Sequence, residues 1–205
     1  MKLPNILTLD TENLSLKLDK PFEDSLGNKT CKISYLEDNS KVIFSVKDIS
    51  LFKKSCLCIE SSTTDSQHLL DSLNNLQLRV CEALERDSME IFNKQFPINK
   101  FLLSYNNYVS SSEDNPSTFF VNLTINEQSK VLNLLGDEIS SEELLLGNCI
   151  IHLDSVTFDK NRFFVNLVLK LFQEVEKEEL KTQEEILENE TEPEISQEEE
   201  ESFFA

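Results

Sequence analysis

Few residues of this chain have the type and spacing that acid–base, nucleophilic or metal chemistry requires. The two histidines, His68 and His152, each lack a partner at the spacing of a metal site. His152 and Asp154 would lie on one face of a strand, where such a pair is more often a structural hydrogen bond than a catalytic dyad. Cys56 and Cys58 are separated by one residue, whereas zinc sites use a C-x2–4-C spacing and a second pair of ligands. We therefore expect no metal, no cofactor and no catalytic residues.

Motifs for phosphate binding and covalent catalysis are also absent from the sequence. Its three glycines are too few for a glycine-rich phosphate loop, and neither G-x-S-x-G nor H-E-x-x-H occurs. The five cysteines are an odd number and lie scattered in mostly apolar stretches, which is typical of free thiols in a reducing, intracellular compartment. These features indicate that the protein is not an enzyme and leave binding as its function.

Charge is distributed unevenly over the 205 residues. The net charge is −19, of which residues 174–205 contribute −12 because they hold 14 Glu and only two Lys, and residues 1–173 contribute the remaining −7. No apolar run approaches the roughly 20 residues of a membrane-spanning helix, and no apolar segment follows the first residues. We therefore expect neither membrane association nor a secretory signal.

The hydrophobic pattern of residues 1–173 indicates one β-rich domain. Alternation predicts short strands at Thr30–Tyr35, Lys41–Val46, Ser50–Ile59, Phe101–Val109, Thr118–Ile125 and Lys130–Leu135. A long hairpin is predicted from Asn148–Phe158 and Arg162–Phe172, with Asp159-Lys160-Asn161 as its turn. One face of its second strand carries Phe164, Asn166, Val168, Lys170 and Phe172. Because both faces are half apolar, we expect this hairpin at the centre of a sheet or barrel.

One long helix interrupts the strands. Its apolar residues recur three or four apart, at Leu69, Leu73, Leu76, Val80 and Leu84, which predicts an amphipathic helix near residues 66–92. Thr64 or Asp65 would cap its start, and Pro97 follows its end. The expected fold class is therefore mainly β with one long helix, a β-rich α+β domain.

Residues 174–205 have a different composition from the domain that precedes them. They are nearly half Glu and contain no Gly and one Pro, which predicts a disordered acidic tail. The tip carries Glu198, Glu199, Glu200 and Glu201, followed after one residue by Phe203 and Phe204. Two interpretations stay open: a solubilising tail, or a docking peptide whose aromatic pair enters a pocket of a partner while the Glu run meets basic residues.

Basic and aromatic residues are interleaved along residues 1–173, the combination with which proteins bind single-stranded nucleic acid. The candidate contacts are Tyr35, Lys53, Lys54, Arg79, Lys94, Lys100, Tyr105, Tyr108, Lys160 and Arg162. The tyrosines are the favoured stacking residues because a phenol tolerates water. Convergence of Lys53, Lys54, Lys94, Lys100, Lys160 and Arg162 on one face would favour nucleic-acid binding, and their dispersal would favour a protein-interaction role.

Several segments between about Leu14 and Gln173 carry a family resemblance. They are Lys32–Tyr35, Lys41–Phe44, Glu90–Phe96, Phe119–Leu123, and the hairpin of Gly147–Phe158 and Phe163–Gln173. In this order they resemble the OB-fold single-stranded DNA-binding proteins of the phage gene-2.5 type, whose relatives occur in large nucleocytoplasmic DNA viruses. The resemblance implies an OB-like Greek-key barrel closed by the hairpin, and sequence-independent binding of single-stranded DNA in viral replication or recombination.

The same resemblance implies that the acidic tail occupies the DNA groove in the free protein and recruits replication proteins. It also implies a location at the viral replication site of the host cell, or in the virion; whether the chain forms a homodimer stays open. An alternative keeps the fold without nucleic acid: a viral structural or protein-interaction module, such as a virion component or an acidic chaperone of basic proteins. In that case the tail would be the active part.

Overall fold

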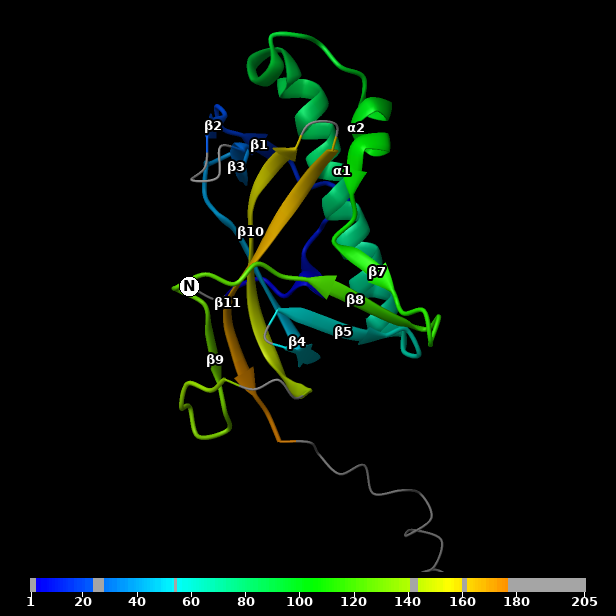
Figure 1. Ribbon diagram of the computed structural model, residues 1–205, viewed down its shortest axis with the longest axis vertical. Coiled ribbons are helices and arrows are strands. Elements are labelled where there is room, and N and C mark those ends of the chain that lie inside the picture. The colour runs from blue at the N-terminus through cyan, green and yellow to red at the C-terminus, as the bar shows by residue number, and fades with distance from the viewer. Residues whose placement is uncertain (1–2, 24–27, 54, 141–143, 160–161, 177–205) are drawn as a thin grey trace, which may run out of the picture.

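The computed structural model describes residues 3–23, 28–53, 55–140, 144–159 and 162–176. Its elements in chain order (Figure 1) are η1 (Ile6–Thr8), β1 (Leu16–Leu18), β2 (Phe22–Glu23), β3 (Lys29–Tyr35), β4 (Val42–Phe52), β5 (Cys56–Glu60), α1 (Thr64–Phe92), α2 (Ile98–Ser104), β6 (Tyr105–Asn106), β7 (Val109–Ser111), β8 (Thr118–Asn122), β9 (Lys130–Leu132), β10 (Leu145–Asp159) and β11 (Arg162–Glu174). In the described part of the chain no helix is long and apolar enough to cross a membrane.

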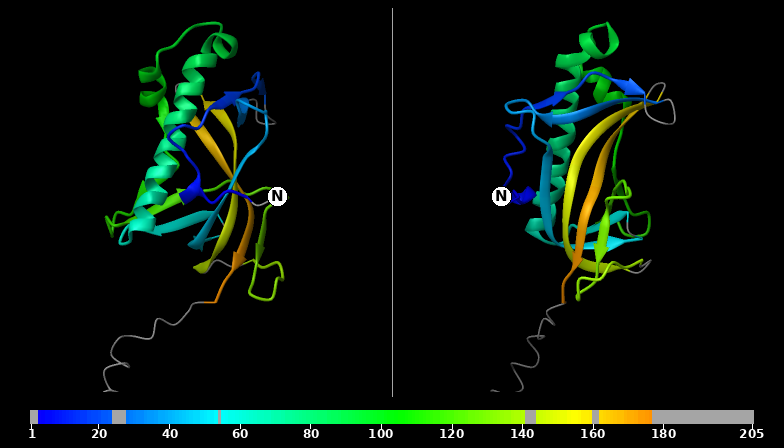
Figure 2. Two further views of the ribbon diagram at one scale, coloured as in Figure 1. Left: turned by 180° about the vertical axis from the view of Figure 1, so that it is seen from behind. Right: turned by 90° about the vertical axis from the view of Figure 1, so that its left-hand side faces the viewer.

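The hairpin of β10 and β11 runs the length of the domain and organises the other strands. Its two strands pair antiparallel from Gly147 opposite Glu174 to Asp159 opposite Arg162. The other edge of β10 is shared, with β4 pairing along its first half and β3 along its second half. Both strands are long and strongly curved, so the sheet that they organise is curved as well (Figure 2). The prediction of a long central hairpin is confirmed.

The half of the domain that contains the start of β10 closes into a barrel. β4 pairs with β5, β5 with β8, and the chain after β8 reaches β11 at Thr124. There the Thr124 amide donates to the Leu167 carbonyl (2.7 Å), and the Leu169 amide donates to the Thr124 carbonyl (3.1 Å). These bonds complete the ring β10–β4–β5–β8–β11. The expected fold class, mainly β with an OB-like barrel and one long helix, is confirmed.

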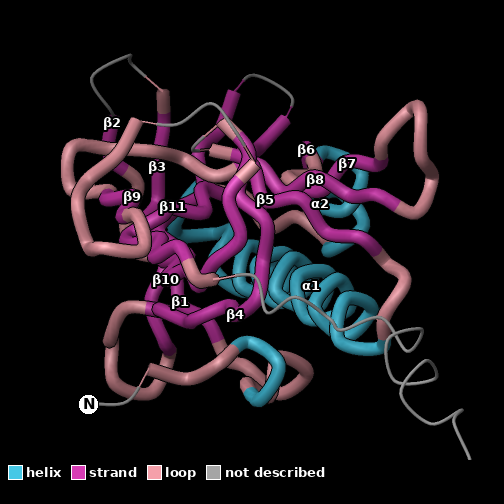
Figure 3. Tube along the Cα trace, turned by 90° about the horizontal axis from the view of Figure 1, so that it is seen from below, coloured by secondary structure: helices cyan, strands magenta, loops and turns pink. Residues whose placement is uncertain are grey.

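The long helix α1 lies alongside the strands (Figure 3) and buries the apolar stripe that the sequence predicts. Its N-cap is Thr63, one residue before the predicted Thr64 or Asp65, because the Thr63 hydroxyl accepts a hydrogen bond from the Ser66 amide (3.2 Å). The helix ends at Phe92, and Asn93, with a left-handed backbone (φ 55°), is its C-cap.

The C-terminal end of α1 is fixed to the sheet by packing of aromatic side chains and by hydrogen bonds. Phe92 packs edge-on against Phe158 of β10, with 5.1 Å between the ring centres. Arg86 donates to the Leu16 carbonyl of β1 (2.7 Å), and the Leu18 amide donates to a carboxylate oxygen of Asp87 (3.3 Å). The helix therefore covers one face of the sheet that contains β1, β3 and the end of β10, and its side chains bond backbone groups on the outer edge of β1.

Two predicted strands differ from the structure. The predicted strand Phe101–Val109 is wrong in its first half, where Phe101–Ser104 belong to the short helix α2 and Phe101 is buried against Phe92, with 6.1 Å between the ring centres. Its second half contains the short strand β6, and β7 begins at Val109. The predicted strand Ser50–Ile59 is divided into the end of β4 and β5 by a turn in which Lys53 has a left-handed backbone (φ 48°). In both cases a local turn signal outweighs the alternating pattern.

Candidate nucleic-acid interface

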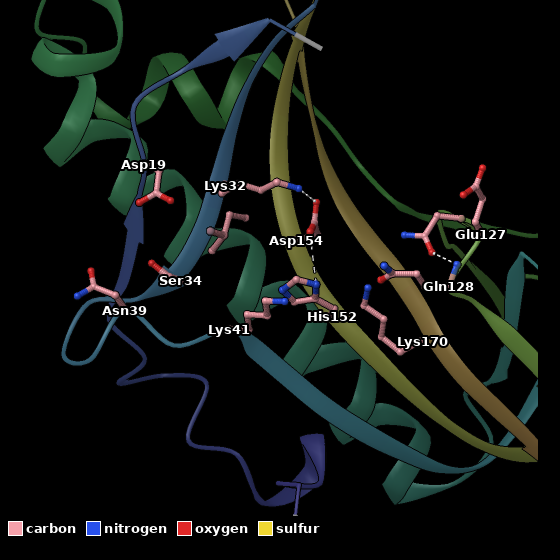
Figure 4. Close-up of a pocket in the computed structure, with 12 residues that line it drawn as sticks. Asp19, Lys32, Ser34, Asn39, Lys41, Glu127, Gln128, His152, Asp154 and Lys170 are labelled. Carbon is pink, nitrogen blue, oxygen red and sulfur yellow. Dashed lines mark hydrogen bonds and ion pairs between the residues drawn. The ribbon is translucent and has the colours of Figure 1, made fainter. Parts of the chain in front are cut away.

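The sheet formed by β2, β3 and the paired ends of β10 and β11 carries no helix on one of its faces. Phe158 and Phe163 point to the side that α1 and α2 cover, where Phe163 lies 6.2 Å from Phe101 between ring centres. The alternate residues of β10 and β11 therefore point to the opposite side, which we call the open face. It is formed by β2, β3, β10 and β11, and the close-up in Figure 4 views it with the helices behind the sheet.

The first row of residues on the open face contains two phenylalanines. Phe22 pairs with Thr30, Thr30 pairs with Thr157, and Thr157 pairs with Phe164, so the four side chains share one side of the sheet. The two threonine hydroxyls lie 3.2 Å apart. Phe22 is 44% exposed and Phe164 is half-buried, so each ring keeps a surface that water can reach.

The second row is a connected polar network. Lys32, Ser155 and Asn166 are cross-strand neighbours. The Asn166 amide donates to the Ser155 hydroxyl (3.0 Å) and to the Thr157 hydroxyl (2.9 Å), and Lys32 Nζ lies 2.7 Å from Asp154 Oδ2. The network therefore joins the first row to a carboxylate.

Asp154 occupies an irregular position in β10, where the pairing register with β11 shifts between Leu153 and Ser155. Burial alone would raise the pKa of Asp154. Hydrogen bonds from Lys32 and from the Ser155 hydroxyl (2.9 Å) outweigh this effect and hold that pKa below its ordinary value. Asp154 is therefore an anion that neutralises Lys32.

Two adjoining cavities deepen the open face. The larger, about 780 Å³, is lined by the lysines Lys32, Lys41 and Lys170, the carboxylates Asp19, Glu127 and Asp154, and polar side chains that include Asn39 and Gln128. The smaller, about 490 Å³, shares Asn126 and Asp154 with it and reaches Phe164 and Asn166. The lysines and carboxylates of the larger cavity balance, so its surface is polar without strong net charge.

His152 lies beneath the larger cavity and is 4% exposed. Neither ring nitrogen has a hydrogen-bond partner, although Nδ1 lies 3.4 Å from Asp154 Oδ1. Burial lowers the pKa of His152; the Asp154 carboxylate opposes that effect, and Lys170, Lys41 and Lys32 add to it. The imidazole is therefore neutral at neutral pH.

The predicted basic contacts do not converge. Lys53 lies at the β4–β5 turn beside the Phe52 ring, next to the start of β10, whereas Arg162 lies at the opposite end of that strand. Lys94 and Lys100 are exposed around α2, and Arg79 pairs with Glu82 at 2.7 Å. Lys54 and Lys160 lie outside the described residues, as do the tail residues Glu198, Glu199, Glu200, Glu201, Phe203 and Phe204.

The predicted stacking tyrosines lie mainly in the core. Tyr108 is 6% exposed, and its hydroxyl donates to the Leu73 carbonyl of α1 (2.5 Å). Tyr105 packs against Phe163, with 5.2 Å between ring centres, and Tyr35 is half-buried at the end of β3. The structure thus corrects the expectation for Tyr108, whose hydrogen-bonded phenol is a core residue. Tyr105 is partly buried, with its hydroxyl covered and its ring packed on the core.

Phe22, Phe164, Asn166 and Lys170 are surface candidates that the predicted contact set does not contain. The alternation of β11 does place Phe164, Asn166 and Lys170 on one face, so the signal is present in the sequence. Phe172 departs from this pattern and is fully buried, because the register with β10 shifts between Ile150 and Ile151. Phe22 belongs to a two-residue strand that no periodic pattern can reveal.

The cysteines do not form a reactive site. Burial raises the pKa of Cys31 to about 11 and the pKa values of Cys81 and Cys149 to about 12, which disfavours the nucleophilic thiolate. Within the residues that the structure describes, no three His, Cys, Asp or Glu side chains form a group that could hold a metal ion.

Comparisons with known proteins give weak likenesses. No family model matches the chain. It is 28% identical over 172 residues to one component of the nuclease SbcCD, the SbcC polypeptide of Staphylococcus aureus; this match covers 78% of the chain, which spans only 16% of that relative.

Among solved structures, the chain is similar to the single-stranded DNA-binding protein of bacteriophage Enc34, with 10% identity and a TM-score of 0.41 over 78% of this chain and 89% of that one. The same phage protein in complex with single-stranded DNA gives 13% identity and a TM-score of 0.37, over 82% and 98% of the two chains. With TM-scores below 0.5, these likenesses do not by themselves assign the chain to a family.

Proposed function

We propose that the open face binds single-stranded DNA without regard to sequence. The observation that carries this proposal is the row Phe22–Thr30–Thr157–Phe164, which lies next to the Lys32–Ser155–Asn166 network. Exposed rings stack on any base, and lysines and polar side chains hold the sugar–phosphate chain. A duplex keeps its bases stacked inside, so the two rings favour single strands.

The two rings serve different bases. Phe22 and Phe164 are three strand-to-strand steps apart, which corresponds to about 14 Å across the sheet. One base cannot stack on both rings at that separation. A strand crossing the sheet would place one base on each ring and present its backbone to the partly exposed Thr157 hydroxyl, the Asn166 amide and the Lys32 ammonium group. The Thr30 and Ser155 hydroxyls are buried and support these groups from below.

The acidic tail has a regulatory role in this proposal. Glu174 ends β11, so the competing segment is residues 177–205, which carry a net charge of −10 and would compete with phosphates for the lysines of the open face. DNA would displace them and free Phe203 and Phe204 for replication proteins. The setting is viral DNA replication or recombination, as the family resemblance of the sequence implies.

A protein-interaction module is the second candidate. The dispersal of Lys53, Lys94, Lys100 and Arg162 favours it, as do the exposed leucines Leu103 (87%) and Leu135 (86%). In that case the open face would not bind DNA at all. A single binding experiment therefore separates the two candidates.

The test is fluorescence anisotropy with a labelled dT oligonucleotide and the full chain. We expect salt-sensitive binding, with duplex DNA bound much more weakly. Phe164→Ala and Phe22→Ala should each weaken binding about five- to hundredfold, the range for losing one base stack. Leu103→Ala, which removes an exposed apolar side chain from α2, is the matched control and should bind as the parent does.

Two results would overturn the proposal. One is the absence of binding even at low salt, and the other is unchanged affinity in both phenylalanine variants. Thermal unfolding of each variant shows whether a weaker affinity reflects a lost stack or a lost fold.

A further inference from the structure

We infer that the larger cavity of the open face is a phosphate subsite, and that phosphate binding there is coupled to the uptake of a proton by His152. This inference rests on the proposed function in that the phosphate would belong to the DNA backbone. It adds a position for one phosphate group and a dependence of the binding affinity on pH. Neither follows from the two rows of side chains on the open face.

The lysines of the cavity provide the attraction for an anion. Lys32 comes from β3, Lys41 directly precedes β4, and Lys170 comes from β11, so three separate segments of the chain bring them together. Lys32 is paired with Asp154, but in the described part of the chain no carboxylate lies within ion-pair distance of Lys41 or Lys170. Figure 4 shows His152 between Lys41 and Lys170.

The unpartnered imidazole is the independent observation that points to a ligand. A buried polar side chain without a hydrogen-bond partner is costly and requires an explanation. His152 is held between Ile43 of β4 and Val168 of β11, its cross-strand neighbours, and lines the same cavity as the lysines. Both ring nitrogens are shielded from solvent, so an anion between Lys41 and Lys170 would give one of them an acceptor once the side chains that cover it move aside.

The charged groups around His152 explain the coupling. Lys32, Lys41 and Lys170 all disfavour the imidazolium, whereas Asp154 favours it. A phosphate that neutralises the lysines would remove their effect and leave Asp154, whose Oδ1 already lies 3.4 Å from Nδ1. Asp19 and Glu127 also line the cavity, and they oppose the anion without contacting the imidazole.

The affinity of the cavity for phosphate depends on pH through the proton that His152 takes up. His152 is neutral in the free protein and takes a proton from solvent when phosphate binds, so the pKa of His152 is higher in the complex. Affinity therefore rises as pH falls through the interval between the two pKa values. A rise of one pKa unit on binding would strengthen the affinity by about tenfold.

The experiment follows the Cε1 resonance of His152 by NMR in the full chain. Only His68 and His152 contribute such signals, and exposed His68 of α1 is an internal control. Two probes are added in turn, inorganic phosphate against chloride at equal ionic strength, and a dT oligonucleotide. We expect both probes to raise the pKa of His152 and to leave the position of the His68 resonance unchanged at a fixed pH.

Charge-matched variants locate the site. Lys170→Gln should abolish the effect of inorganic phosphate on His152. Lys47→Gln removes the same charge from a lysine that lines a different cavity, beside η1 and α1, and should keep the effect. Equal behaviour of the two variants would mean that the anion acts through general screening, which overturns the subsite.

The outcomes also separate this inference from the proposed function. If the oligonucleotide binds but neither probe moves the His152 signal, the subsite is wrong and DNA binding stands. If phosphate moves the signal but no oligonucleotide binds, the subsite stands and the proposed function is wrong. If neither probe binds, both are wrong.

Discussion

Two neighbouring tyrosines differ in how their hydroxyl groups are accommodated. The Tyr108 hydroxyl donates to the Leu73 carbonyl, whereas the Tyr105 hydroxyl is buried without a partner. Burial raises the pKa of both phenols, so both remain neutral donors at neutral pH. Their rings are in contact, with 6.1 Å between the ring centres, so the two residues form a matched pair in one environment.

Replacing each tyrosine by phenylalanine should therefore have different effects on stability. Tyr108→Phe should lower the free energy of unfolding by about 1 kcal/mol, because it removes a made hydrogen bond. Tyr105→Phe should leave stability unchanged or raise it by up to about 1 kcal/mol, because it removes a buried hydroxyl that has no partner. Urea unfolding followed by circular dichroism measures both values. An equal loss in the two variants would contradict this assignment.

Residue roles were harder to predict from the sequence than residue positions. The preference of phenols for wet surfaces favoured Tyr105 and Tyr108 as stacking residues. In the structure Tyr108 is buried with its hydroxyl bonded to a helix carbonyl, and the partly buried Tyr105 packs against the Phe163 ring. Phe164 shows the reverse: it lies in an apolar run, yet its strand face is open. Periodicity says which residues share a face, and only tertiary packing decides which face a helix covers.

The register of the β10–β11 hairpin depends on one glycine. A Cβ atom at Gly147 would collide with the Gln173 carbonyl oxygen and would lie 2.6 Å from a ring carbon of the fully buried Phe172. Both neighbours belong to β11, so the hairpin can close at this end only if position 147 has no side chain.

Gly147→Ala should lower the free energy of unfolding by about 1–3 kcal/mol, the usual cost of overpacking a closed site. Gly136→Ala is the matched control, because a Cβ atom there meets open space and only the left-handed backbone (φ 87°) opposes it. That variant should lose about 1 kcal/mol or less. Thermal or urea unfolding compares the two, and a larger loss at Gly136 would contradict the packing argument.

Secondary-structure elements with a long periodic hydrophobic pattern were predicted correctly from the sequence. Elements that depend on a short turn signal or on a tertiary contact were not. The hairpin and α1 each contain enough periodic residues to define their type. The α2 helix depends on Pro97 and on the fit of Phe101 between Phe92 and Phe163, and no local pattern contains that fit. The contact that closes the barrel is likewise made by one residue, Thr124, which bridges to β11, and no local sequence pattern predicts it.

At the scale of the whole molecule, negative charge is concentrated in the C-terminal part of the chain. Residues 1–173 carry −7, yet three lysines converge on the open face and face three carboxylates there. Such a balanced surface binds polyanions weakly unless the lysines are free to contact them. A strongly negative segment on the same chain would therefore have a large effect on binding.

Removing residues 177–205 should tighten the binding of a dT oligonucleotide and steepen its loss with added salt, because a competing polyanion of net charge −10 (12 Glu against two Lys) is gone. The truncation should begin at 177 and not at 174, because Glu174 accepts a hydrogen bond from the Leu134 amide and the Val175 amide donates to the Leu146 carbonyl. Fluorescence anisotropy of both chains over a salt series measures the difference. A variant in which the 12 Glu are changed to Gln keeps the length and tests the charge alone. If the truncated chain bound no better than the full chain at low salt, the tail would not compete for the open face, and its role would be sought in protein partners.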